Sequence, residues 1–319
     1  MIPTKKNFFD IYPKITLGVI LSILILSTIL LAEWAAGSLG LGKTVLYEAN
    51  PIYGYRPRPN QIVARRVDQT IKINNLGLRA ETDWDPKNYH NKILFLGDSV
   101  TYGGSYIANN QLFSHLAVAP FPEWEAGNAG VNGWGVNNVY ALVKETGFLP
   151  AQIYVSVFPE GDFYRGYTRI GGQAFWTRPP RFALEELFQY CVYKLNLKKM
   201  PLREYYALNT AEKNQIASIA VRNLKALDDY LKAQGRTHLI YISPSRENLL
   251  GQPLLEVDPV VKGLLAESGI NAVYLQERLT SYSNAEIQGL FHDNIHLSQE
   301  GHAAWGKMIA QDLNKFLSL

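Results

Sequence analysis

Two short polar stretches, far apart in the chain, contain a nucleophile, a base and an acid. The first reads GDSVTYG from residue 97 and places Ser99 directly after the apolar run 93–96. The second reads FHDNIHLS from residue 291 and places Asp293 three residues before His296. A serine hydroxyl needs a base to take its proton, and that base needs an acceptor to fix its tautomer. The residue types therefore predict Ser99 as nucleophile, His296 as base and Asp293 as the carboxylate that orients the base.

Each stretch has other interpretations when it is taken alone. A GDS turn can be a capped helix start or a phosphate-binding turn. His292, Asp293 and His296 could hold a metal ion, or they could be polar residues before a helix. That helix is expected to begin after Ser298, so the two histidines, although four residues apart, are not expected to share a helical face. We expect no metal and no cofactor.

An alternation of strands and helices from residue 91 onward is expected to position both stretches. Apolar runs predict strands at 93–96, 153–158, 238–242 and 270–275, and amphipathic stretches predict helices at 136–145, 210–235 and 299–317. Strands that alternate with helices form a parallel sheet covered on both faces. Ligands of such sheets bind at the carboxyl ends of the strands, where both polar stretches are expected to lie.

The N-terminal region predicts a membrane anchor. Residues 15–32 carry no charge and would span roughly 27 Å as a helix, about one hydrocarbon core. A cleaved signal peptide and a buried helix of a soluble protein are the alternatives. Lys5, Lys6 and Lys14 precede this stretch and Glu33 follows it, so the positive-inside rule places the N-terminus in the cytoplasm.

The predicted anchor and the strand–helix alternation divide the chain into four parts. Residues 1–14 would be a cytoplasmic tail, 15–32 a transmembrane signal anchor, 33–90 a tether with an N-terminal extension, and 91–319 the enzyme domain. Everything after the anchor would then lie on the periplasmic or extracellular side of a cytoplasmic membrane. The formal net charge of +3, spread over 319 residues without a polybasic run, argues against nucleic acid as a partner.

Residues 163–206 interrupt the alternation and are rich in aromatic side chains. They are interpreted either as a helical subdomain with its own small core or as a lid that stacks on sugars or faces lipid. Cys191, the single cysteine, excludes an internal disulfide. It is expected to be a small buried hydrophobic residue.

Taken together, the two polar stretches resemble the SGNH (GDSL-type) hydrolase family over roughly residues 91–319. The sequence GNAGVNG at 127–133 resembles the second motif of that family, and INNLGLR at 73–79 resembles an entry segment of its membrane-anchored members. The resemblance implies a flavodoxin-like three-layer α/β/α domain with a parallel sheet. It also implies an oxyanion hole formed by the N–H groups of Ser99 and Gly133.

The resemblance implies further substrate contacts but is incomplete at one position. Asp98, Asn132 and Asp162 are expected to bind substrate. The family motif Gly-x-Asn-Asp carries a further oxyanion donor on its asparagine, whereas this chain reads FPEGD at 158–162 and places Gly161 there. One such donor is worth about 10²–10³ in rate.

The sequence therefore predicts a membrane-anchored serine esterase or O-acyltransferase that acts on O-acyl esters, with a cell-surface glycan or a small ester as substrate. Gly161 motivates an alternative, namely a weak or inactive module that binds glycan or partners a membrane acyltransferase. A lipase directed at membrane lipids is a third possibility.

Overall fold

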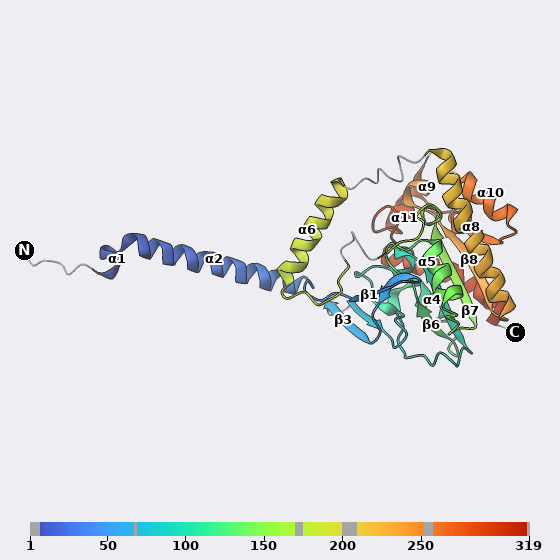
Figure 1. Cartoon of the computed structure of the whole chain (residues 1–319), viewed down its shortest axis with the longest axis horizontal. Helices are drawn as coiled ribbons and strands as arrows, with labels where there is room; N and C mark the ends of the chain where they lie inside the picture. Colours follow the sequence, from blue (N-terminus) through green and yellow to red (C-terminus); the bar gives the residue numbers. More distant parts are fainter. Residues whose placement is uncertain (1–6, 67–68, 170–174, 200–208, 252–257, 318–319) are drawn as a thin grey trace, which may run out of the picture.

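The computed structural model describes residues 7–66, 69–169, 175–199, 209–251 and 258–317 (Figure 1). The strands are β1 (Tyr47–Asn50), β2 (Gly54–Pro57), β3 (Gln61–Arg66), β4 (Gln69–Ile73), β5 (Lys92–Gly97), β6 (Glu125–Asn128), β7 (Ile153–Pro159), β8 (Thr237–Ser243) and β9 (Ala272–Tyr274). The α-helices are α1 (Phe8–Ile11), α2 (Pro13–Ser38), α3 (Ser99–Tyr102), α4 (Phe113–Val118), α5 (Val136–Tyr140), α6 (Ala183–Lys199), α8 (Thr210–Ala233), α9 (Arg246–Leu250), α10 (Pro259–Glu267), α11 (Asn284–Gly289) and α12 (Gln299–Leu317).

A five-stranded parallel sheet forms the centre of the protein. Its strand order is β6-β5-β7-β8-β9, and every neighbouring pair in it is parallel. When the five strands are renumbered along the chain the order becomes 2-1-3-4-5, which is the flavodoxin-like order. The predicted fold class is confirmed. The strand order reverses at β5, the strand that leads into Ser99.

Successive side chains of a strand point to opposite faces of the sheet. Because the strands are buried on both faces, helices cover both of them. In β5, Leu94 and Leu96 belong to the core shared with α5, α8 and α10, whereas Ile93 and Phe95 belong to the core shared with α4 and α12. All six residues of β5 are buried. Each fully buried Leu or Phe side chain contributes about 1.5–3 kcal/mol of transfer free energy, so both layers hold the strand that carries the nucleophile.

The N-terminal extension packs against the edge of this domain. β1 pairs with β2, and β3 pairs with β4, each antiparallel. The backbone of Arg79 then pairs with that of Asn128 at the end of β6, with N···O distances of 2.8 and 3.0 Å. Tyr55 and Trp84 are buried in the same core as the main sheet. Gly77 adopts a positive φ of 75°, a conformation that favours glycine.

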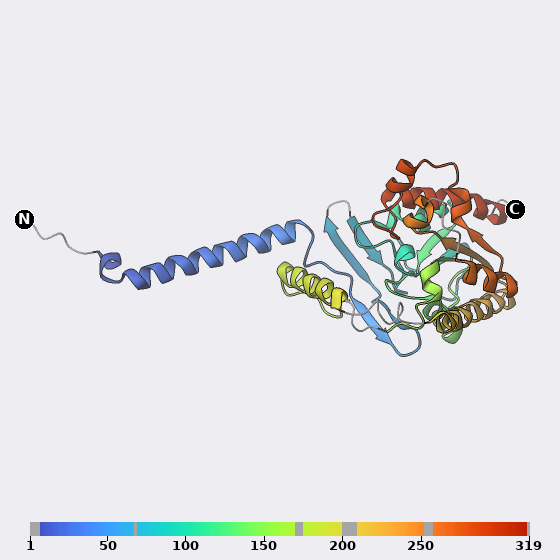
Figure 2. The same ribbon diagram turned by 90° about the horizontal axis from the view of Figure 1, so that it is seen from above.

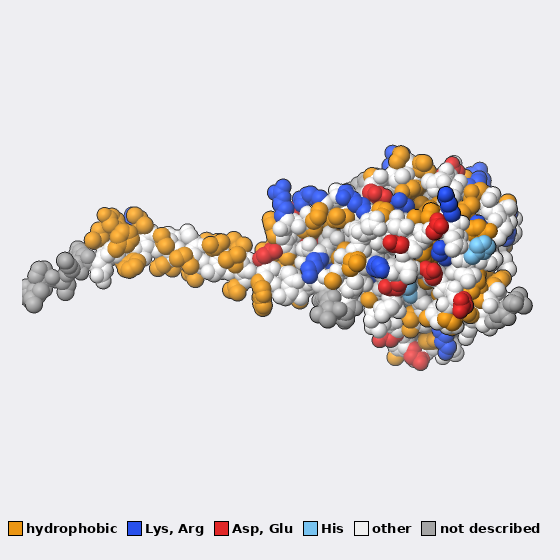
Figure 3. Space-filling model, turned by 90° about the horizontal axis from the view of Figure 1, so that it is seen from below, with side chains coloured by type: hydrophobic (Ala, Val, Ile, Leu, Met, Phe, Trp, Pro, Cys, Tyr) orange, Lys and Arg blue, Asp and Glu red, His pale blue; other side chains and the backbone are white. Residues whose placement is uncertain are grey.

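Helix α2 projects away from the folded part as a single long rod (Figures 1 and 2). It has 26 residues, about 39 Å at 1.5 Å per residue, and contains the whole predicted span 15–32. Hydrophobic side chains cover its surface, and the most apolar part is not buried by the rest of the chain (Figure 3). By length and composition this helix can cross a membrane. Lys5 and Lys6, which predict its orientation, lie outside the described residues.

The aromatic segment 163–206 does not form a subdomain with its own core over the residues that the structure describes. Phe163 and Tyr164 are buried in the main core. Helix α6 instead lies beside the end of α2 (Figure 1). Tyr205 and Tyr206 lie outside the described residues. The prediction of a buried Cys191 is wrong, because this residue is on the outward apolar side of α6 and is exposed.

Two helices differ from their predicted extents. The predicted helix 136–145 is α5 followed by a π-helical turn, Ala141–Glu145. Helix α8 begins at Thr210 as predicted and ends at Ala233, two residues before the predicted end. Asn209 is its N-cap, since the Asn209 side chain accepts a hydrogen bond from the N–H of Glu212. Neither difference moves a residue of the site.

Candidate active site

Ser99 lies where β5 turns into α3, at the carboxyl end of the strand at which the strand order reverses. Gly97 precedes it with a φ of 156°, and a side chain there would collide with Thr101 and with the carbonyl group of Val157. The Asp98 side chain caps α3 by accepting the Val100 N–H at 2.8 Å. Ser99 is therefore the first residue of a short helix, half-buried at the edge of the sheet.

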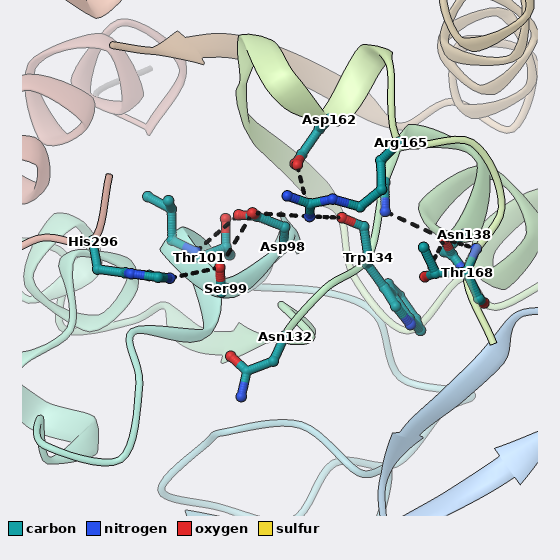
Figure 4. Close-up of polar contacts among 12 residues, drawn as sticks. Asp98, Ser99, Thr101, Asn132, Trp134, Asn138, Asp162, Arg165, Thr168 and His296 are labelled. Carbon is teal, nitrogen blue, oxygen red and sulfur yellow. Dashed lines mark hydrogen bonds and ion pairs between the residues drawn. The ribbon is translucent and has the colours of Figure 1, made fainter. Parts of the chain in front are cut away.

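A continuous chain of hydrogen bonds connects Ser99 to the second polar stretch (Figure 4). The Oγ atom of Ser99 lies 2.8 Å from Nε2 of His296, and Nδ1 of His296 lies 2.7 Å from Oδ2 of Asp293. The structure thus brings together the three residues that the sequence predicted, across 197 positions. The tautomer that accepts at Nε2 and donates from Nδ1 to the carboxylate is the one that a general base requires.

The loop that carries Asp293 and His296 is held in place at several points. The His292 N–H donates to the His296 carbonyl at 2.8 Å. Tyr106, from the loop after α3, stacks on the His292 ring at 4.2 Å between centroids and donates its hydroxyl to the Leu297 carbonyl. The base is therefore fixed relative to the segment that follows the nucleophile.

Asp293 is kept in its charged form. Burial raises its pKa, but the N–H groups of His296 and Ile295 and the His296 imidazole donate hydrogen bonds to it. These donors outweigh burial, so the pKa of Asp293 lies below its usual value. A charged carboxylate at this position stabilises the imidazolium that forms when His296 takes a proton.

The sequence resemblance assigns an oxyanion hole to the backbone N–H groups of Ser99 and Gly133. Among the described residues no hydrogen bond takes up the N–H of Ser99 or that of Gly133. Gly133 has a φ of 77°, which favours glycine. Its turn is fixed by the buried Asn128, whose side chain accepts from the Gly130 N–H and donates to the Thr101 carbonyl. Among the described residues both N–H groups are therefore left to donate to another acceptor, as an oxyanion hole requires.

Gly161 leaves an open space where the sequence resemblance expects an asparagine. It is the second residue of a short 3-10 helix, Glu160–Phe163, that directly follows β7. A Cβ atom at Gly161 would meet nothing within 4 Å, and the φ of Gly161 lies outside the left-handed region. A side chain can therefore be added at this position without backbone strain.

Asp98 and Asp162 lie behind Ser99 instead of facing a substrate. Their side chains are both 0% exposed. Arg165 lies between them, with Nη1 3.4 Å from Asp98 Oδ2 and 3.0 Å from Asp162 Oδ1, and it donates to the Trp134 carbonyl at 2.6 Å (Figure 4). The expectation that the two aspartates contact substrate is corrected by this burial. Both support the Ser99 turn from within.

Burial and the nearby charge of Asp98 raise the pKa of Asp162 well above its usual value, although Arg165 lowers it. One guanidinium thus faces two buried carboxyl groups. Two like charges this close are not favoured together, which contributes to the raised pKa of Asp162.

Asn132, the third expected substrate contact, remains accessible and is held by the N-terminal extension. Tyr55 on β2 donates its hydroxyl to the Asn132 carbonyl at 2.7 Å. The Asn132 amide nitrogen lies 3.3 Å from the Tyr47 hydroxyl on β1. The N-terminal extension thereby fixes the residue that directly precedes Gly133.

A cavity of about 160 Å³ begins at Asn132 and extends toward α6. Its walls combine aromatic rings with hydroxyl and amide groups and with the Arg65–Glu186 ion pair, 2.8 Å apart. The lining includes Tyr47, Tyr102, Asn132, Phe175, Trp176 and Tyr190. Such a mixture of ring faces and hydrogen-bonding groups accommodates a polar ring better than a purely aliphatic chain.

A second Ser–His–Asp chain in the protein has no access to solvent. His238 contacts Ser156 through Nε2 at 2.9 Å and Asp228 through Nδ1 at 3.2 Å. All three side chains are buried between the sheet and α8, and burial lowers the pKa of His238.

Sequence reasoning did not assign roles to Arg165 and Arg79. Arg79 is 1% exposed and donates to the carbonyl groups of Tyr102, Gly104 and Ile107 and to the Asn109 side chain, so it fixes the loop after α3. Its place in the LGLR stretch of the sequence was a usable signal. Arg165 lies in the aromatic segment 163–206, and nothing in the sequence there indicated its role.

Comparisons with known proteins give similar structures but no close relatives. No protein-family profile matches the chain, and neither does any curated protein. A member of the lipolytic protein G-D-S-L family from Veillonella parvula has 12% identity and a TM-score of 0.42, and the match covers 70% of this chain and 98% of that one. A lipase/acylhydrolase from Enterococcus faecalis has 15% identity and a TM-score of 0.42, with coverage of 71% and 96%.

An acetylxylan esterase from Geobacillus stearothermophilus, in a catalytic mutant form, has 17% identity and a TM-score of 0.40, with coverage of 74% and 97%. The names of these proteins agree with the family that the sequence motifs resemble.

Proposed function

We propose that this chain is a membrane-anchored serine ester hydrolase of the SGNH type. One observation carries the proposal, namely the unbroken chain from Ser99 through His296 to Asp293 at 2.8 and 2.7 Å. Nucleophile, base and orienting acid within hydrogen-bond distance are the arrangement that acyl transfer to a serine requires.

The proposed reaction has two halves. Ser99 Oγ attacks the ester carbonyl while His296 takes the hydroxyl proton at Nε2, and the N–H groups of Ser99 and Gly133 stabilise the tetrahedral oxyanion. Collapse of this intermediate breaks the bond to the alcohol, which leaves with the proton from His296. His296 then deprotonates the acceptor as it attacks the acyl-Ser99 ester. Collapse of the second tetrahedral intermediate breaks the bond between the acyl carbon and Ser99 Oγ, and His296 returns the proton to Oγ. Water as acceptor gives hydrolysis, and a sugar hydroxyl gives O-acyl transfer.

The proposed substrate is an O-acyl group on a glycan outside the cytoplasm. The cavity beside Asn132 supports this choice, because its aromatic rings and hydroxyl groups suit a sugar ring. The proposed location follows from α2 and from the lysines before it. The alternative of an inactive binding module, motivated by Gly161, is less favoured by a triad that is complete.

Acyl-chain profiling of the purified full-length chain tests this proposal. We expect turnover of p-nitrophenyl acetate and of an acetylated oligosaccharide, little turnover of long-chain esters, and loss of all turnover in Ser99→Ala. Preference for long-chain esters would favour a lipase. An absence of turnover on every ester in the folded protein would favour the inactive module.

A further inference from the structure

Helix α6 carries an apolar stripe that no other described part of the chain covers. Leu187, Phe188, Cys191 and Leu195 recur at helical spacing and are all exposed, Phe188 at 65% and Leu195 at 59%. The opposite side of α6 faces the folded part. There, Glu186 accepts the Gly42 N–H at 2.6 Å and pairs with Arg65.

The start of α6 is fixed to the end of the apolar span. The carboxylate of Glu33 accepts hydrogen bonds from the N–H groups of Ala183 and Leu184, at 2.5 and 2.9 Å. A carboxylate at a helix N-terminus satisfies free N–H groups and complements the helix dipole. Glu33 is also the first charged residue after the uncharged stretch 15–32. The first turn of α6 therefore lies level with the outer boundary of the span.

The direction of α6 and its flanking residues fit a membrane surface. In Figure 1, α6 runs across the axis of α2, starting where α2 meets the folded part. A helix in this position lies roughly in the plane of the membrane that α2 would cross. The exposed Trp34 on α2 and the exposed Arg181 and Lys194 near the stripe are residue types found at membrane–water interfaces.

We propose that α6 is an interfacial helix whose stripe of Leu187, Phe188, Cys191 and Leu195 inserts into the outer leaflet of the membrane that α2 spans. The proposal rests on the membrane insertion of α2 proposed above. It commits to lipid as the occupant, because Glu33 fixes the start of α6, the helix that carries the stripe, at the end of the span. Tyr190 and Glu186 line the cavity from the same helix. The cavity would then open within about one helix diameter, ~10 Å, of the lipid headgroups.

The single native cysteine permits a direct test in the full-length chain. Cys191 is labelled with a nitrobenzoxadiazole fluorophore, and the protein is reconstituted into vesicles of phosphatidylethanolamine and phosphatidylglycerol. The matched control is Gln189→Cys in a Cys191→Ser background, since Gln189 is exposed on a different side of α6. A third variant, Leu24→Cys in the same background, reports on the middle of α2.

We expect a blue-shifted emission at Cys191, strong quenching by nitroxide-labelled lipid, and a several-fold lower quenching by aqueous iodide than at Gln189→Cys. Leu24→Cys should be quenched by lipid and shielded from iodide. If Leu24→Cys is shielded while Cys191 is quenched by iodide as strongly as Gln189→Cys, the interfacial helix is wrong and the anchor stands. If Leu24→Cys is also open to iodide, the anchor and the interfacial helix both fail, while esterase activity remains a separate question.

Discussion

The proposed oxyanion hole of Ser99 and Gly133 lacks the asparagine donor that the family motif places at Gly161, so replacing Gly161 with asparagine should increase catalysis. A Cβ atom at Gly161 would meet nothing within 4 Å, and its φ lies outside the left-handed region. The substitution therefore adds an amide donor without backbone strain. Asparagine and glycine differ little in helix propensity, so we expect the free energy of unfolding to change by less than about 0.5 kcal/mol.

The size of the gain follows from the value of one oxyanion donor, about 10²–10³ in rate or roughly 3–4 kcal/mol. This value is a ceiling for Gly161→Asn. The gain should appear in kcat more than in KM, because the donor binds the oxyanion more strongly than the ground-state carbonyl. The assay is steady-state hydrolysis of p-nitrophenyl acetate by the full-length chain.

Gly161→Ala is the matched control, since it adds the Cβ atom without the donor and should leave kcat unchanged. A folded Gly161→Asn protein with unchanged or lower kcat would refute the reasoning. Another group would then already fill the position, and the Asn132 amide, held near Tyr47, would be the first to examine.

Three further predictions concern the residues around the triad. Asp293→Asn should lower kcat by about 10⁴, less than Ser99→Ala does, since it removes the charge that stabilises the His296 imidazolium; a loss below tenfold in kcat assays would contradict this role. Arg165→Met should lower the free energy of unfolding by about 3–5 kcal/mol, because it leaves two carboxyl groups buried without a cation. In denaturant titrations, adding Asp162→Asn to this variant should restore part of the lost stability. Burial lowers the pKa of His302 to about 3. Between pH 6.5 and 3 the unfolded chain therefore binds one more proton at this residue than the folded chain does. The free energy of unfolding should then fall on acidification through that range, by about 1.4 kcal/mol per pH unit. His302→Asn should remove this contribution to the slope of unfolding free energy against pH, and an unchanged slope would argue against a neutral buried His302.

The sheet and the triad were predictable because their signals are local. The apolar run before Gly97 gives a buried strand, and a three-residue gap between Asp293 and His296 lets one loop supply both groups. Their approach to Ser99 could be inferred only through the order of strands and helices, since 197 positions separate the two segments. The parallel sheet supplied that link.

The roles of Asp98, Asp162 and Cys191 were not predictable from residue type. Polar residues next to a nucleophile suggest substrate contacts, but the burial of Asp98 and Asp162 depends on Arg165 approaching from a segment without repeating pattern. Cys191 lies in an apolar stretch, which predicts burial in a soluble protein. The outward direction of its side chain follows from the contact between α6 and the end of α2, which is a tertiary feature.

The most direct test of the central claim, that Ser99 is a nucleophile activated by His296, is labelling with a fluorophosphonate. Attack by Ser99 Oγ on phosphorus expels fluoride, and the hydroxyl proton passes to His296. We predict one adduct per chain, mapped by peptide mass spectrometry to Ser99, lost in Ser99→Ala, greatly slowed in His296→Ala and retained in a folded Ser156→Ala control. A folded wild-type protein that forms no adduct, or forms one at another residue, would contradict the account.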